Sequence, residues 1–208
     1  MSNVTTIPLY RMTHIENLPH ILQYGITHRN SPIRNDHYAS IGDGSLISVR
    51  TSFPTPTGKL LGDYTPFYFG PRMPMLYVIQ KGYNGVNPVP AADIVYCVTS
   101  VGRIIDEGLD FAFTDGHAVD VLTEFFGPNR VAEMNQLLDW RAINARYWRN
   151  DADLDLKRKK EAEFLVLGDL PITAVERFIV YNAEARERIH RIHSFNNQSV
   201  IVNSNCYF

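Results

Sequence analysis

The sequence predicts an α+β fold, with residues 1–208 forming one domain. Short segments rich in β-branched and aromatic residues, typical of strands, are interspersed with segments that favour helices. Because these segments follow no regular order of strand, helix and strand, a doubly wound parallel sheet is not expected. No segment has the composition of a linker, and 208 residues are enough to enclose one hydrophobic core.

The N-terminal third contains one expected strand, one expected helix and two irregular segments. Residues 9–14 (LYRMTH) are predicted to form a strand, and residues 17–24 a helix that Gly25 ends. Residues 28–48 carry Asn, Pro, Gly and Ser at turn positions and are expected to be irregular. Residues 53–67 form a Pro- and Gly-rich loop, of the kind that covers or lines a site.

The rest of the chain supplies most of the expected sheet. The same signals predict further strands, two helices on either side of Gly127-Pro128, and an edge strand in the tail. The strands are expected at 74–82, 94–100, 161–168 and 177–182, the helices at 118–127 and 130–138, and the edge strand within 199–208.

The overall composition excludes several classes of protein. Hydrophobic residues make up 45% of the chain, and no run of 18 apolar residues could form a membrane span. The first residues lack the basic and apolar regions of a secretory signal. Cys97 and Cys206 have no paired spacing, which argues against a disulfide framework and fits a reducing cytosol, so we expect a cytoplasmic protein.

The net charge of −2 gives no general signal for binding nucleic acid. Binding must therefore come from local patches, and the candidates are Arg141–Arg149 and Lys157–Lys160. The segment from Trp140 mixes Tyr147 and Trp148 with Arg146 and Arg149. Rings for base stacking beside cations for phosphates are what single-stranded nucleic acid requires. Helical spacing would also place Trp140, Ile143 and Tyr147 on one buried stripe, so at least half of the aromatic residues are expected in the core.

Glu163 is the first candidate for chemistry. In EAEFLV, Ala162, Phe164 and Val166 are expected to face a core, so Glu163 points to the opposite side of the strand. A carboxylate in mid-strand is disfavoured and must face water, a partner or a site. The pattern alone favours a solvated strand face balanced by the basic residues upstream.

Arg50, His14 and His117 are weaker candidates. Arg50 follows an apolar stretch and suits a diphosphate, because its planar fork makes paired hydrogen bonds, but an arginine at a strand end is more often a surface ion-pair partner. His14 lies at a predicted strand–helix junction and His117 in a predicted turn. Neither has metal-ligand spacing, so no metal is expected. A phosphate-binding P-loop, a serine nucleophile elbow and a dinucleotide-binding glycine fingerprint are absent from the sequence.

Taken together and in this order, the motifs resemble the DarT family of DNA ADP-ribosyltransferase toxins. The resemblance covers nearly the whole chain. Its motifs are LYRMTHIENLPHIL, LISVR, GKLLGDYTPFYFGPRMPMLY, FTDGHA, LDWRAINARYW, KKEAEFLV and the final CYF. The DYTPFYFGPRMPMLY block is the most specific, because it is long and unusual in composition.

The resemblance implies a fold, a reaction and roles for particular residues. The implied fold is a split, mostly antiparallel β core whose central cleft holds NAD, and no metal is required. Glu163 is implied as the catalytic glutamate and Arg50 as the arginine that clamps NAD, while Arg11 and His14 border the nicotinamide side. The substrate-facing elements are implied to be His117 and the segment Trp140–Arg158, with Arg146, Tyr147, Trp148 and Arg149 binding DNA. A macrodomain antitoxin that removes ADP-ribose from DNA is the implied partner.

The implied reaction transfers ADP-ribose from NAD to a base, thymine by preference, in single-stranded DNA. A carboxylate near the ribose can stabilise the oxocarbenium-like charge and act as general base toward a ring nitrogen, and Glu163 is a candidate for both tasks. An exposed ring nitrogen requires an unpaired base. Other acceptors remain open, namely guanine, RNA or protein, and so does a binding module without catalysis. Glu161 departs from the family pattern, and it either alters the charge near the acceptor or pairs with Lys159.

Overall fold

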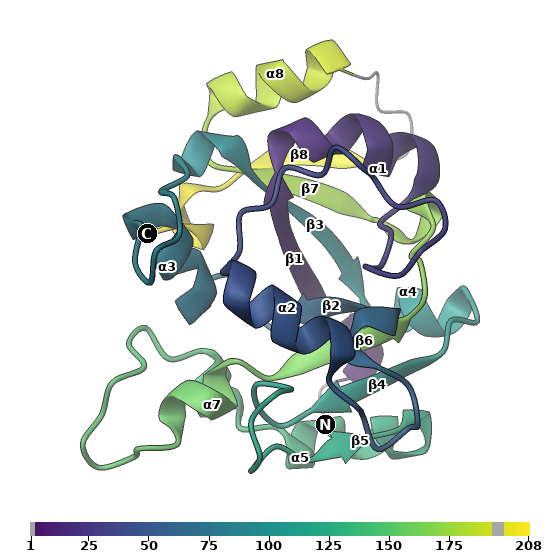
Figure 1. The fold of residues 1–208 in the computed structure, drawn as a ribbon, viewed down its shortest axis with the longest axis vertical. Helices are drawn as coiled ribbons and strands as arrows, with labels where there is room; N and C mark the ends of the chain where they lie inside the picture. Colours follow the sequence, from purple (N-terminus) through teal and green to yellow (C-terminus); the bar gives the residue numbers. More distant parts are fainter. Residues whose placement is uncertain (1–2, 193–197) are drawn as a thin grey trace.

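The computed structural model describes residues 3–192 and 198–208. Its eight strands form one sheet in the order β5-β4-β6-β2-β1-β3-β7-β8. Every pair of neighbours is antiparallel except β7 and β8, which are parallel. Helices lie around this sheet, with α1 and α8 together on one side and α2 set apart in front of it (Figure 1). The predicted α+β class with a mostly antiparallel core is confirmed.

The elements have the following bounds. The strands are β1 (Pro8–His14), β2 (Tyr64–Tyr68), β3 (Ile94–Ser100), β4 (Phe111–Thr114), β5 (Phe125–Phe126), β6 (Glu163–Leu167), β7 (Arg177–Val180) and β8 (Ser199–Val202). The α-helices are α1 (Leu18–Tyr24), α2 (Gly44–Ser52), α3 (Pro74–Lys81), α4 (Val101–Asp106), α5 (Met134–Leu137), α6 (Trp140–Ile143), α7 (Leu156–Lys160) and α8 (Ala183–Ile192). Short 3₁₀ helices include Ile15–Asn17, Leu61–Asp63 and Pro128–Glu133.

The hydrophobic core lies on both faces of the sheet because the strand residues alternate. Phe164 and Val166 of β6 join the larger cluster with α1, α4, α5 and α8, as the sequence pattern predicted. Tyr96 and Val98 of β3 join a second cluster beneath α3, which includes Tyr207 from the tail. Burying apolar surface at about 25 cal/mol per Å² makes these two clusters the main favourable contribution to folding.

The sheet is split between β1 and β2. Among the described residues these two strands pair at one position, Tyr10 with Tyr68, whereas β1 pairs with β3 along its whole length. Pro66 explains the gap. Its carbonyl accepts a 3.0 Å hydrogen bond from Nη1 of Arg11. The carbonyl of Pro66 therefore faces β1. In a strand the N–H of a residue points to the same side as its carbonyl, but proline has no N–H, so it cannot donate to β1. Pro66 therefore withholds a donor that a continuous ladder between β1 and β2 would need, at the place where the predicted split lies.

Several predicted elements are confirmed. Strands form within 9–14, 94–100, 161–168 and 177–182, and β8 lies at the edge of the sheet as expected of the tail. Helix α1 ends at Gly25, whose φ of 82° suits glycine. A Cβ at Gly25 would lie 2.2 Å from the carbonyl oxygen of Leu170, so that position admits no side chain.

Five predictions of secondary structure are wrong. Residues 64–67, expected in a loop, belong to β2, and residues 44–48, expected to be irregular, begin α2. Residues 74–82 form α3 rather than a strand, with Pro74 in its first turn and Gly82 left-handed after its last. Arg50 lies on a helix, α2, rather than at a strand end, because the Asp43 side chain caps Ser45 N and Leu46 N. Residues 118–127 form a turn followed by β5 instead of a helix.

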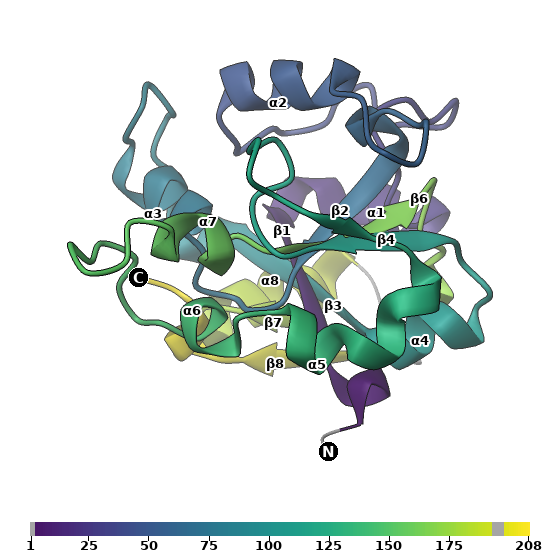
Figure 2. The same cartoon turned by 90° about the horizontal axis from the view of Figure 1, so that it is seen from below.

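Helix α3 and the tail pack in the same hydrophobic cluster. In residues 3–192 and 198–208, none of the helices has the length and hydropathy of a membrane span. The view from below separates α2 from the sheet and shows α6 and α7 beside each other at one end (Figure 2). The segment between α6 and α7 projects from that end.

Candidate active site

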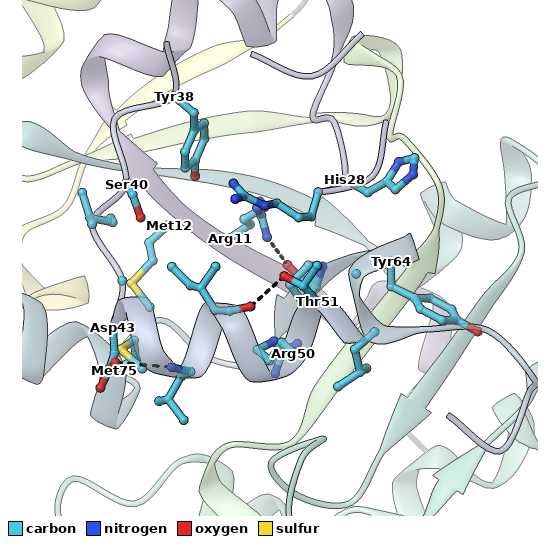
Figure 3. A pocket seen from close by; sticks show the side chains of 18 of the residues that line it. Arg11, Met12, His28, Tyr38, Ser40, Asp43, Arg50, Thr51, Tyr64 and Met75 are labelled. Carbon is cyan, nitrogen blue, oxygen red and sulfur yellow. Dashed lines mark hydrogen bonds between the residues drawn. The ribbon is translucent and has the colours of Figure 1, made fainter. Parts of the chain in front are cut away.

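A cleft of about 260 Å³ opens at the split in the sheet. Its walls come from β1, β2, the segment 27–43 and α2, and Glu163 and His117 reach it from the neighbouring half of the sheet. In Figure 3 Arg11 and Tyr38 lie on one side of the cavity and α2 with Arg50 on the other. Four arginines and two histidines line the cleft against two carboxylates, so the cavity favours an anionic ligand. The arginines are Arg11, Arg29, Arg34 and Arg50.

The carboxylate of Glu163 is held in one orientation. Nη1 and Nη2 of Arg50 donate to its two oxygens at 2.9 and 2.6 Å, and the backbone N–H of Ala118 donates to Oε1 at 2.9 Å. The Glu163 N–H donates to Thr114 Oγ1. Two ionised oxygens offer about four acceptor sites, and these three bonds leave one of them, on Oε2, for a ligand.

The charge of Glu163 is secured by the same contacts. Burial, which leaves the side chain 1% exposed, would raise the pKa of Glu163. The charge and hydrogen bonds of Arg50 outweigh burial, with help from His117 and Ala118 N, and the pKa is lowered below its usual value. In turn, burial lowers the pKa of Arg50 and Glu163 raises it, with a net rise. The pair is therefore fully ionised at neutral pH.

Helix α2 holds Arg50 in place without entering the core. The structure describes every residue of α2, and none of them is buried. It is secured instead by its Asp43 cap and by close approach to the 3₁₀ turn that precedes β2. A Cβ on Gly62 would lie 2.6 Å from the Thr51 carbonyl, so glycine is needed for that approach. The third anchor of α2 is the Arg50–Glu163 pair itself.

A second polar cluster fixes the loop opposite α2. Asp169 accepts hydrogen bonds from the backbone N–H of His28 at 2.8 Å and from Ser31 Oγ at 2.7 Å. Its Oδ1 is 2.6 Å from Nδ1 of His28. These contacts hold His28 and the adjoining Arg29 at the cleft. Neither residue was selected in the sequence analysis, because no local motif marks them.

His117 lines the cleft and is anchored from the back. Its N–H donates to the Arg158 carbonyl at 3.1 Å, and its carbonyl accepts from Thr123 Oγ1 at 2.8 Å. Burial lowers the pKa of His117, opposed in part by Glu163, so its imidazole is neutral at neutral pH.

The structure does not bring His14 into the cleft. His14 is the last residue of β1, and its Nδ1 accepts a hydrogen bond from the Glu16 N–H, which caps the 3₁₀ turn that follows. Tyr68, which the sequence analysis did not select, lines the cleft instead. It lies opposite Glu163 in the β2–β6 register, and burial raises its pKa. The signal for Tyr68 was its place in the DYTPFYFGP block.

The four predicted DNA-binding residues of the 144–155 segment differ in environment. The side chain of Tyr147 is 70% exposed, and the Arg146 guanidinium lies 5.5 Å from its ring centroid. Trp148 instead packs edge-on against Tyr77 at 5.5 Å and Phe208 at 5.7 Å. Arg149 is exposed. Of the residues expected on a buried stripe, Ile143 is buried and Tyr147 is not.

The basic run Lys157–Lys160 is not a free cationic patch. Arg158 bonds Asp155 and Asp115, and Lys159 lies within 4 Å of three aspartates. Lys160 is buried and donates to the Ile143 carbonyl at 2.9 Å, and burial lowers its pKa to about 8. The run therefore ties the segment 144–155 to the rest of the protein.

Glu161 is buried rather than paired with Lys159, whose contacts are aspartates. Burial raises its pKa to about 7, with nearby Lys157 opposing the shift and Glu163 adding to it. Among the described residues, no group of three or more His, Cys, Asp or Glu side chains could hold a metal ion.

A family model described as "ssDNA thymidine ADP-ribosyltransferase, DarT" matches residues 10–208. The chain belongs to the DarT family. A "DNA ADP-ribosyl transferase" of Thermus sp. (strain 2.9) is 39% identical over 193 residues, which cover 89% of this chain and 86% of that protein. Family membership makes the protein an NAD-dependent DNA ADP-ribosyltransferase, as the sequence predicted.

Solved DarT structures share the fold. Thermus sp. 2.9 DarT in complex with ADP-ribosylated ssDNA matches with a TM-score of 0.80 and 33% identity, over 97% of this chain and 96% of that one. The same DarT in complex with NAD+ matches with a TM-score of 0.75 and 34% identity, over 97% and 98%. A Thermosipho africanus fusion of DNA ADP-ribosyl transferase and DNA ADP-ribosyl glycohydrolase is 26% identical over 93% of this chain and 47% of the fusion.

Proposed function

We propose that the protein transfers ADP-ribose from NAD to thymine in single-stranded DNA, with Glu163 as the catalytic carboxylate. The observation that carries the proposal is the buried, ionised Arg50–Glu163 pair, which faces a cleft lined by arginines. A carboxylate kept ionised and oriented before the substrate arrives can stabilise positive charge without reorganising.

The diphosphate of NAD fits the basic lining of the cleft. Arg11 enters from β1, and Arg29 and Arg34 enter from the segment opposite α2. Charge-assisted bonds from such guanidinium groups are the strong contacts that phosphate oxygens accept. Both Nη atoms of Arg50 bind Glu163. We therefore assign Arg50 first to orienting the carboxylate, and only second to the clamping of NAD that the family resemblance implied.

The reaction breaks the bond between the ribose C1′ and the nicotinamide nitrogen, and nicotinamide leaves with the electron pair of that bond. The ribose gains oxocarbenium-like charge in the transition state. The free acceptor site on Oε2 of Glu163 can receive the ribose 2′-hydroxyl and place the negative charge beside C1′. The thymine ring nitrogen then forms the new bond to C1′ and loses its proton.

The sequence analysis made Glu163 a candidate both for stabilising the ribose charge and for general-base catalysis. Its lowered pKa suits the first task but not the second. A carboxylate with a low pKa stabilises charge well but is a weak general base. His117 lines the same cleft, and burial lowers its pKa, which keeps the imidazole neutral and able to accept a proton. We assign the proton of the thymine ring nitrogen to His117.

The acceptor strand is assigned to the rim beside His117 and to the segment 144–155. The exposed ring of Tyr147 suits base stacking, and Arg146 and Arg149 suit phosphates. A paired base cannot present its ring nitrogen, so duplex DNA should react poorly.

One experiment tests the proposal as a whole. The protein is incubated with NAD and matched single-stranded and duplex oligonucleotides, and the product is analysed by mass spectrometry. One ADP-ribose on a thymine of the single strand supports the proposal, and Glu163→Gln serves as the inactive control. Modification of guanine, RNA or protein, or equal labelling of the duplex, contradicts it.

We also propose an antitoxin partner, a single-domain organisation and a cytoplasmic location. The Thermosipho relative combines transferase and glycohydrolase in one chain, which supports a macrodomain-type antitoxin that removes ADP-ribose as a partner here. Residues 1–208 are assigned to one domain because every described strand joins one sheet. A cytoplasmic location is supported by the two free cysteines, Cys97 and Cys206.

A further inference from the structure

Two large apolar side chains project into solvent beside the cleft. Val121 is 94% exposed and Leu122 is 69% exposed. Scattered exposed hydrophobic residues are ordinary, but two adjacent ones at a loop tip place a continuous apolar surface in water. Both belong to residues 118–123, which we call the tip loop and which follow His117 in the connection from β4 to β5.

The tip loop is tightly hydrogen-bonded. The Asp120 N–H donates to the His117 carbonyl at 2.9 Å, and the Leu122 N–H donates to Asp120 Oδ1 at 2.9 Å. Thr123 closes the loop, because its N–H donates to the Asp120 carbonyl and its hydroxyl to the His117 carbonyl. Val121 and Leu122 are therefore presented by a defined turn.

The tip loop is also joined to the catalytic carboxylate and to α7. Ala118, its first residue, donates its N–H to Glu163 Oε1 at 2.9 Å. The Arg158 guanidinium bonds Asp115 at 2.9 Å and Thr123 Oγ1 at 3.3 Å. A Cβ on Gly116 would lie 2.4 Å from Nη1 of Arg158, so the chain leaves room there for this guanidinium.

These contacts place the tip close to the reacting atoms. Three peptide units separate Ala118 from Val121, so their Cα atoms lie at most about 11 Å apart. Figure 2 shows the loop projecting beneath α2, the helix that carries Arg50.

We propose that Val121 and Leu122 form an apolar contact for a base next to the modified thymine. This inference rests on the proposed function. The local charge favours a base over a phosphate, because Asp120 and the exposed Glu124 flank the tip, while the Arg158 charge is already taken up by Asp115 and Asp155. The uncharged face of a base fits such a surface, and the turn that carries the two side chains is already ordered by its own hydrogen bonds before binding.

The test compares Val121→Ser/Leu122→Ser with the wild type and with Ile105→Ser, an exposed residue on α4, as the matched control. We expect the KM for a single-stranded oligonucleotide to rise about tenfold in the double variant. The KM for NAD, the melting temperature and the slope of affinity against salt should stay unchanged, because no core contact and no phosphate contact is lost. Leu122→Phe should retain or tighten DNA binding. A KM for DNA within twofold of the wild type overturns the proposal.

A second measurement identifies the contacted base. Oligonucleotides that carry one abasic site at successive positions around the reactive thymine are assayed with both proteins. We expect one flanking abasic site to weaken the wild type about tenfold and the double variant by less than twofold, since both changes remove the same contact. Additive losses at every position contradict the proposal. An unchanged DNA KM together with lost binding of a purified antitoxin would reassign the tip to a protein partner. If the wild type modifies no single-stranded DNA, the proposed function itself fails.

Discussion

The cleft wall and the segment 144–155 differ in how their functional side chains are held. On the wall, Glu163 is buried, charged and fixed by three hydrogen bonds from Arg50 and Ala118. In the segment, Arg146 and Tyr147 are exposed, and the Arg146 guanidinium lies 5.5 Å from the centroid of the Tyr147 ring. The wall holds charges in place before the reaction, whereas the segment keeps its polar and aromatic groups available for a variable strand.

The difference predicts which mutations harm stability and which harm only recognition. Removing one partner of a buried ion pair leaves the other charge uncompensated, which costs about 3–5 kcal/mol. Removing an exposed side chain usually changes stability by less than about 0.5 kcal/mol.

Glu163→Gln should have the largest effect. The side chain keeps its shape, but the charge that opposes the developing ribosyl cation is lost. We expect kcat for transfer to fall at least about a hundredfold, the loss typical of removing one preorganised electrostatic contact. Steady-state transfer to a single-stranded oligonucleotide measures this, with the exposed Glu184→Gln as control. Transfer at more than about a tenth of the wild-type rate, a loss of only about 1.4 kcal/mol, would place the catalytic charge elsewhere.

Arg50→Ala should change the pH dependence as well as the rate. Burial raises the pKa of Glu163 and Arg50 reverses this, so without Arg50 the pKa rises above its usual value. Glu163 acts in its ionised form and His117 in its neutral form, so activity is lost as the pH falls through the pKa of either group, and Arg50 lowers both pKa values. The acidic limb of kcat should therefore move to higher pH in Arg50→Ala and less so in Arg50→Lys, which retains the charge. Identical pH profiles of kcat in the wild type, Arg50→Ala and Arg50→Lys would show that Arg50 does not control the pKa of Glu163.

Glu161→Gln should stabilise the protein in a pH-dependent manner. Burial raises the folded-state pKa of Glu161 from 4.5 to about 7, so the folded state binds the proton more tightly than the unfolded state. Wild-type stability therefore falls as the pH rises from about 4.5 to 7, and a glutamine has no such loss. At pH 8 the variant should gain up to about 3 kcal/mol in free energy of unfolding, with little gain at pH 4.5. Urea unfolding at both values measures it. An equal gain at both pH values would trace the effect to packing.

Tyr147→Ala and Trp148→Ala should have different effects, the first on DNA binding and the second on stability. Loss of the exposed Tyr147 ring should cost about 1–3 kcal/mol of DNA binding and leave the melting temperature unchanged. Trp148 packs on Tyr77 and Phe208, so its loss should lower the free energy of unfolding by about 1–3 kcal/mol, less than for a fully buried ring. Thermal melting and oligonucleotide affinity are compared for both. The reverse pattern would mean that Trp148 leaves its aromatic contacts when DNA binds.

Arg146→Gln and Arg149→Gln should have the smallest effects. Each should reduce the slope of log affinity against log salt by about 0.7 for a single strand if it neutralises one phosphate. Base preference and melting temperature should not change. A titration between low and moderate salt suffices. An unaltered slope in the double variant would show that the phosphates are bound elsewhere on the protein.

Alternation along β6 was readable from the sequence because it is a local property. The pattern placed Glu163 opposite Phe164 and Val166, and the structure confirms it. The partner of Glu163 was not readable, because Arg50 is 113 residues away and no local rule connects the two. Only the family resemblance selected both residues for one site.

The two helices that were predicted as strands share one cause. In 46–50 and 74–82, apolar β-branched and aromatic residues favoured strands, and the terminal signals were given too little weight. Asp43 is a good helix N-cap, and Pro74 with Gly82 brackets α3 in the usual order. Residues 118–127 showed the opposite error, since the spacing of their apolar residues resembles a helix although Val121 and Leu122 face solvent.

The split in the sheet has a consequence for the solubility of the protein. Opening β1 from β2 creates two strand edges, and unpaired edges are templates on which another chain can add a strand and aggregate. Pro66 offers no N–H to such a strand, and the Arg11 guanidinium covers the Pro66 carbonyl. Pro66 and Arg11 therefore make this part of the β2 edge a poor template for a foreign β-strand.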